Sequence, residues 1–138
     1  MKTIHEPLRL EFLSALLLKS SNANADIVAN YRRGDDGLPI SHAPGNHADI
    51  EVYFENALQL YEVTLMTGAA QAKAEMAPIS RHQKEARAKN ASKMDLNVET
   101  VFIAPSIHAD SEMWADFIAL RDNVKIVNRT IEEFASLI

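Results

Sequence analysis

The sequence predicts an α/β fold in which a mixed central sheet is flanked by helices on both faces. Two adjacent apolar runs, residues 48–54 and 58–65, are separated by "ENA", which is typical of a hairpin. After them, helix-like segments alternate with short buried runs such as "ETVFIAP", which indicates parallel strands joined by helices. With 138 residues and 47% hydrophobic content, residues 1–138 are expected to form a single domain with a packed core.

The first part of the chain predicts one helix followed by a long loop. Pro7 suits the first turn of a helix, and "LRLEFLSALLLKS" continues it to about Lys19 with apolar residues on most of its circumference. Residues 26–46 are rich in Gly, Pro, Asn and Asp, so we expect a loop there, with a short helix around residues 27–31.

The second part predicts three more helices and two more strands. Residues 69–93 are helical by composition, and Pro78 must kink that helix or divide it. A buried strand follows at 99–105, and the next helix is capped by Asp110 or Ser111. A strand at 124–128 and an amphipathic helix over 129–138 complete the expected order.

The composition excludes several classes of protein. There is no cysteine, so disulfide scaffolds and thiolate metal sites are excluded and a cytoplasmic location is expected. The first 25 residues imitate a signal peptide, but Glu6, Pro7 and Glu11 argue against one. No apolar run reaches the roughly 20 residues of a membrane span. The net charge of −5 does not indicate nucleic-acid binding, although residues 80–93 carry five basic residues against one acid.

The predicted hairpin contains acids in otherwise apolar strands. With a two-residue turn at Asn56 and Ala57, or a four-residue turn over residues 55–58, Glu51 is expected opposite Glu62, and Asp49 opposite Thr64. These four residues would share one face of the sheet because side chains alternate along a strand. Asp49 and Glu62 would be diagonal neighbours, roughly 7–8 Å apart, close enough for both carboxylates to bind one cation. Oxygen ligands without cysteine favour a hard ion such as Mg²⁺, and a solvent-exposed hairpin edge is the alternative.

Other polar residues also lie in apolar surroundings. Glu11 shares a helix face with Leu8, Ala15 and Leu18, so it either lies near a cation or pairs with an arginine, for which the candidates are Arg9, Arg32 and Arg33.

The helix after the hairpin carries a second polar group. If it continues through Pro78, Gln71, Glu75 and His82 fall on one stripe. His82 would then contact a phosphate, lie at the surface or transfer a proton. A zinc site at His42, His47 and Asp49 is a weaker alternative.

These pieces together resemble a known family. "PLRLEFLSALLL", "HADIEVYF", "YEVTLMTGAAQAKAEMAPISRH" and "TVFIAPSIHADSEMWADF" are similar in order and spacing to the cleavage domain of AlwI-like type IIS restriction and nicking endonucleases. That group includes PleI and MlyI and lies within the PD-(D/E)XK nuclease superfamily, so the resemblance implies a restriction-endonuclease-like core.

The resemblance implies a metal-dependent endodeoxyribonuclease. It implies that Asp49 and Glu62 bind Mg²⁺ together with the Val63 carbonyl and Glu11, that two ions can bind and that Mn²⁺ can substitute. It also implies that Glu75 and His82 complete the active site. Thr64 stands where the superfamily motif E-x-K places lysine, and Glu75 or His82 is expected to substitute, ahead of Lys73. The phosphate-binding residues would be Arg81, Lys84, Arg87 and Lys89.

The resemblance also implies partners. Family members carry a separate DNA-recognition domain, and nothing in residues 1–138 resembles it. The expected partners are double-stranded DNA, that recognition domain, and a second cleavage domain or subunit for cutting both strands, with no membrane. The competing interpretation is a non-catalytic metal-binding or dimerisation module of a DNA-processing complex.

Overall fold

The protein is an α/β domain built around one five-stranded mixed sheet. The computed structural model describes residues 5–41, 47–92 and 96–136. The strand order is β1-β4-β5-β6-β7, with β1, β4 and β5 antiparallel and β5, β6 and β7 parallel. The predicted fold class is therefore confirmed. In chain order the elements are α1 (Glu6–Ser21), β1 (Asp26–Ala29), β2 (Arg32–Arg33), β3 (Pro39–Ser41), β4 (Ile50–Tyr53), β5 (Ala57–Val63), α2 (Ala69–Gln71), the π-helix η1 (Ala72–Met76), α3 (Ala77–Lys89), β6 (Asn97–Ala104), α4 (Ala109–Asp122), β7 (Ile126–Thr130) and α5 (Ile131–Ser136).

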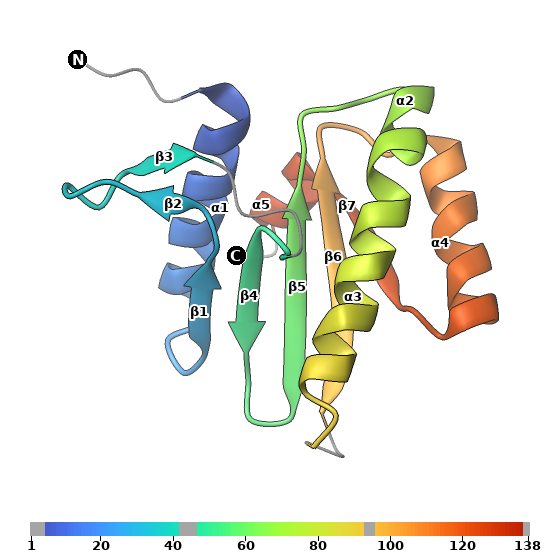
Figure 1. Ribbon diagram of the computed structural model, residues 1–138. Helices are drawn as coiled ribbons and strands as arrows, with labels where there is room; N and C mark the ends of the chain where they lie inside the picture. Colours follow the sequence, from blue (N-terminus) through green and yellow to red (C-terminus); the bar gives the residue numbers. More distant parts are fainter. Residues whose placement is uncertain (1–4, 42–46, 93–95, 137–138) are drawn as a thin grey trace.

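Helices cover both faces of the sheet. In Figure 1, α3 and α4 lie in front of the sheet and α1 and α5 behind it. Behind the sheet, Leu18 of α1 and Phe134 of α5 pack with strand residues such as Ile50 and Ile103. In front of it, Ile79 packs with Phe102 and partly buried Trp114. Alternate residues of β5 and β6 therefore belong to two cores, which explains why these strands read as nearly continuous apolar runs.

The hairpin forms, but its predicted register is wrong. The Phe54 N–H donates to the Ala57 carbonyl, so Glu55 and Asn56 are the two turn residues. Glu51 consequently faces Leu60, not Glu62. Continuing this register by one pair places Asp49 opposite Glu62. Because the change is an even number of residues, the acids still share the sheet face that α3 covers.

In residues 26–41, the described part of the segment predicted as a loop with a short helix, three short strands form in place of that helix. β1 pairs with β4 at the edge of the main sheet, and β2 and β3 form a separate two-stranded sheet. The turn of this small ribbon is set by Gly37, which has φ +80°, and by Asp36 Oδ1, which accepts the Leu38 N–H. Isolated four- and two-residue strands leave little periodicity in the sequence, and here tertiary pairing decides the conformation.

Helical structure continues through Pro78 because a π-turn precedes it. α2, η1 and α3 follow one another without a break from Ala69 to Lys89. Pro78 has no N–H to donate, and it falls directly after the segment where the regular α-helical hydrogen bonds are replaced. Neither a break nor two separated helices is seen.

The C-terminal half follows the prediction with small differences. β6, α4, β7 and α5 occupy the expected segments, but the side chain that caps α4 is His108, whose Nδ1 accepts the Asp110 N–H at 3.0 Å. The predicted caps, Asp110 and Ser111, lie inside the helix. His42 and Lys93 lie outside the described residues. Within the described part of the chain, no helix has the length and apolar character needed to cross a bilayer.

Candidate active site

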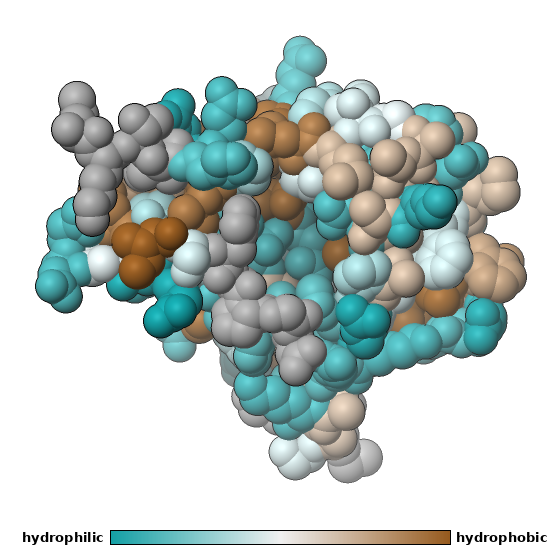
Figure 2. Space-filling view, turned by 45° about the horizontal axis from the view of Figure 1, so that its top comes forward, coloured by the Kyte–Doolittle hydropathy of each residue, from teal (hydrophilic) through white to brown (hydrophobic). Residues whose placement is uncertain are grey.

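Acidic side chains from two strands and two helices line one pocket at the end of the sheet. The pocket has a volume of about 440 Å³ and opens where β4 begins and β5 ends. Figure 2 shows hydrophilic residues gathered in a hollow on this face of the molecule. Of the predicted site residues, the structure brings together Glu11, Asp49, Glu62, Val63, Glu75 and His82.

Half-buried Asp49 and buried Glu62 lie side by side in this pocket. Asp49 Oδ2 accepts the Val63 N–H at 2.8 Å, which ties the start of β4 to the end of β5. Glu62 is 5% exposed, and its Oε2 lies 2.6 Å from Nδ1 of His82 on α3. A hydrogen-bond partner therefore fixes the orientation of each carboxylate.

Burial also makes these acids difficult to ionise. Burial raises the pKa of the Asp49 carboxyl well above its ordinary value, and the negative charges of Glu62 and Glu11 raise it further. Burial likewise raises the pKa of Glu62, and the hydrogen bond with His82 opposes that effect. A positive charge placed among these acids would relieve both effects.

Glu75 is held beside Thr64, the residue that the sequence resemblance marks as a departure from E-x-K. The Thr64 hydroxyl donates to Glu75 Oε1 at 3.2 Å and accepts the Met66 N–H at 3.0 Å. Glu75 lies in the π-helix η1, and such turns recur at functional sites. The sequence alone marks Thr64 only as a departure from the motif, and its contact with Glu75 emerges from the fold.

Glu11 reaches the pocket from α1. It is 3% exposed and lies beside Asp49 closely enough that its charge raises the pKa of Asp49. The expected alternative, an ion pair with a loop arginine, is wrong for Arg32 and Arg33, which are exposed and pair with no acid in the described part of the chain.

Gln71 does not belong to this site. Its buried amide bonds the Met66 and Ser106 carbonyls, the His108 N–H and the Ser111 hydroxyl. Because a π-turn follows Gln71, this residue does not lie on the helix face that Glu75 and His82 share. The prediction that all three residues share one face is therefore wrong for Gln71.

The four basic residues predicted to bind phosphates do not share one surface. Lys89 borders a second pocket, of about 170 Å³, that shares His82 with the acidic pocket. Arg81 and Lys84 line a groove between α3 and α4, where Lys84 pairs with Asp122. Arg87 lies at another pocket with Asn97 and Asn123.

The donor types in the acidic pocket fit a hard divalent cation. All of its acids offer carboxylate oxygens, and the burial of several like charges favours a cation among them. In residues 5–41, 47–92 and 96–136, however, no three Asp, Glu, His or Cys side chains are arranged as a ligand group. The contacts with the Val63 N–H and with His82 each engage one oxygen of Asp49 and of Glu62, respectively.

One residue that supports the site was not predicted from the sequence. Asn30, just after β1, donates its backbone N–H to the Asp49 carbonyl at 2.9 Å, and its side chain donates to the Ala48 carbonyl at 2.8 Å. It fixes the backbone of Asp49 from the edge of the sheet. An asparagine in a Gly- and Asp-rich segment gives no sequence signal of such a role.

Comparison with solved structures finds a close similarity. The small subunit of the heterodimeric restriction endonuclease R.BspD6I superposes with a TM-score of 0.81 and 26% sequence identity, over 98% of this chain and 69% of that one. A search of the curated proteins gave no match.

Comparison with protein families agrees with this structural match. The family model described as AlwI restriction endonuclease matches residues 2–137. The match spans nearly the whole chain and includes every element that lines the acidic pocket. The chain belongs to the AlwI restriction endonuclease family.

Proposed function

We propose that the chain is a Mg²⁺-dependent endonuclease domain that hydrolyses one phosphodiester bond of double-stranded DNA, as part of a type IIS restriction or nicking enzyme. One observation carries the proposal: half-buried Asp49 and buried Glu62 lie beside each other at adjoining strand ends, in a pocket that Glu11, Glu75 and His82 also line. Restriction endonuclease family membership supports the same chemistry.

Asp49 and Glu62 would hold the cation, with Glu11 and the Val63 carbonyl as further ligands. Mn²⁺ could substitute for Mg²⁺, and the number of acids leaves room for a second ion. A divalent cation so bound would lower the pKa of a bound water and neutralise charge on the phosphate. Residues 62–64 read E-x-T where a PD-(D/E)XK site has E-x-K. The acids around this sequence would complete such a site in this chain.

Glu75 would accept the proton of the attacking water in place of the motif lysine. The Thr64 hydroxyl donates to the Glu75 carboxylate, so this carboxylate lies next to the residue that stands in the place of the motif lysine. His82 orients Glu62 through one ring nitrogen. From its place between the two pockets it would contact the scissile phosphate or assist proton transfer.

The partners follow from this assignment. Lys89 is the predicted basic residue whose pocket shares His82 with the acidic pocket, while Arg81, Lys84 and Arg87 would bind phosphates only of a longer DNA segment. Specificity would come from a DNA-recognition domain. Cutting both strands would need a second cleavage domain or subunit, in keeping with the heterodimeric enzyme that contains the similar small subunit.

Nicking of supercoiled plasmid tests the proposal. The chain, alone and fused to a DNA-binding module, is expected to convert supercoiled plasmid to open circles in Mg²⁺. Asp49→Asn or Glu62→Gln should reduce the rate at least about 10³-fold while the circular dichroism spectrum is unchanged. Glu132→Gln, an exposed acid on α5, is the matched control and should retain full activity.

Two outcomes would contradict the proposal. One is activity that survives both substitutions, which would place the chemistry elsewhere. The other is a fused chain that never nicks DNA in Mg²⁺ or Mn²⁺, which would favour a non-catalytic metal-binding or dimerisation module.

A further inference from the structure

The small ribbon of β2 and β3 presents two arginines whose role is unassigned. Arg32 and Arg33 are both exposed, and neither forms an ion pair with any described residue. Arginine presents a planar fork of donors that matches phosphate oxygens, so two unpaired arginines on a fixed strand are suited to phosphate binding.

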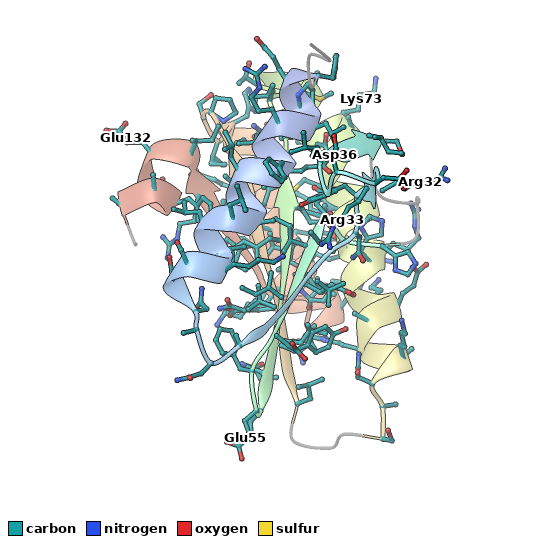
Figure 3. The ribbon with its side chains drawn as sticks, turned by 90° about the vertical axis from the view of Figure 1, so that its left-hand side faces the viewer. Arg32, Arg33, Asp36, Glu55, Lys73 and Glu132 are labelled. Atoms are coloured by element: carbon teal, nitrogen blue, oxygen red, sulfur yellow. The ribbon has the colours of Figure 1, made fainter. Side chains whose placement is uncertain are left out.

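The ribbon is attached directly to the acidic pocket. Asn30, which holds the Asp49 backbone, is two residues before Arg32. Two extended residues span at most about 7 Å, so the backbone of Arg32 lies close to that of Asp49. Figure 3 shows Arg32 extending outward on the side of the sheet that α3 covers, which is also the side of the buried acids.

The ribbon is also anchored rather than free. Tyr31 is 6% exposed and packs edge-on against Phe12 of α1, with ring centroids 6.0 Å apart. The guanidinium of Arg33 lies over the Tyr31 ring, 5.4 Å from its centroid. Phe12 follows Glu11 in the chain, so the helix that carries a pocket acid also positions the ribbon.

The charges around the ribbon limit where DNA could lie. Asp35 and Asp36 are exposed at its turn and would repel phosphates, although Asp36 is partly engaged with the Leu38 N–H. A DNA strand would therefore pass the strand that carries the arginines and not the tip. On the other side of the two pockets, Lys89 of α3 offers a positive charge.

We propose that Arg32 and Arg33 bind DNA backbone phosphates on the ribbon side of the acidic pocket, so that the scissile phosphate is positioned between the ribbon and α3. This inference rests on the proposed nuclease function for its ligand. It adds a phosphate-binding site in a segment distinct from the basic stretch of α3.

Salt-dependent DNA binding tests the inference without cleavage. A fluorescent duplex is titrated with the chain at several salt concentrations and without divalent ions. Arg32→Ala and Arg33→Ala should each weaken binding about tenfold and reduce the slope of log K against log salt by about 1. Lys19→Ala is the control, because Lys19 is an exposed cation in the last turn of α1 and lines none of the pockets described above. It should change neither quantity.

A crosslinking experiment gives a second readout, because the chain contains no cysteine. Arg32→Cys carrying a photoactivated crosslinker should attach to the duplex, and Glu132→Cys on the opposite face should not. The inference is overturned if both arginine variants bind like the unaltered chain, if that chain does not bind DNA at low salt, or if position 32 fails to crosslink. Because no cleavage is measured, these outcomes are separate from loss of nicking in Asp49→Asn.

Discussion

At the scale of single residues, the burial of Asp49 has a measurable consequence for stability. Its carboxyl has a raised pKa because it is buried near the charges of Glu62 and Glu11. The folded protein thus holds a proton that the unfolded chain releases at lower pH. This group favours the folded state fully at low pH, and the contribution is lost as pH rises through the folded-state pKa.

Asp49→Asn should therefore stabilise the protein when divalent ions are absent. At pH 7 the variant should melt at a higher temperature than the unaltered chain, and each 1 kcal/mol relieved corresponds to about 4 °C. The difference should shrink as the pH is lowered towards 4. Thermal unfolding followed by circular dichroism at several pH values checks this. A variant that is less stable at pH 7 would show that the charge at position 49 is already compensated.

Thr64 gives a second prediction at this scale. Thr64→Val has a similar shape but cannot donate to Glu75. If Glu75 accepts the proton of the attacking water, kcat should fall about tenfold to a hundredfold, with little change in DNA affinity. Thr64→Ser keeps the hydroxyl and should restore most of the rate. Equal rates for the valine and serine variants would exclude this role for Thr64.

At the scale of elements, the π-turn η1 decides which helical residues face the site. It sets Glu75 and His82 towards the pocket and Gln71 towards the loops at Met66 and Ser106. The composition of residues 69–93 predicted a helix but could not locate a π-turn, because that turn depends on contacts made by Gln71 with segments more than 30 residues away.

Gln71 should consequently be important for stability although it is not part of the site. Gln71→Leu leaves the Ser106 carbonyl, the His108 N–H and the Ser111 hydroxyl without this partner, and it should cost on the order of 3 kcal/mol of unfolding free energy. Gln59→Leu is a control, because Gln59 is half-buried and should cost less than about 1 kcal/mol. Denaturant titrations measure both. Similar losses in the two variants would contradict the importance given to the buried amide.

The hairpin shows what sequence patterns could predict about the site. Alternation along the strands correctly placed Asp49 and Glu62 on one face, because that depends only on a period of two. The register required the turn residues, and "ENA" is compatible with more than one loop. Asn30 and the ribbon lay in a segment without periodicity, so their position beside Asp49 could not be anticipated.

At the scale of the whole molecule, a net charge of −5 coexists with a proposed role in binding DNA. Part of the negative charge is concentrated in the pocket, where bound cations would offset it. The basic residues lie on separate surfaces of α3 and on the ribbon. We therefore expect the chain alone to bind DNA weakly, since few phosphates can be contacted at once.

Anomalous scattering from crystals soaked in Mn²⁺ would locate the divalent cation that we propose Asp49 and Glu62 hold together. We expect a peak in the acidic pocket within about 2.0–2.4 Å of a carboxylate oxygen of each residue, and no such peak in crystals of Asp49→Asn. A saturating soak that leaves this pocket without a peak, or that places Mn²⁺ only at other acids, would contradict it.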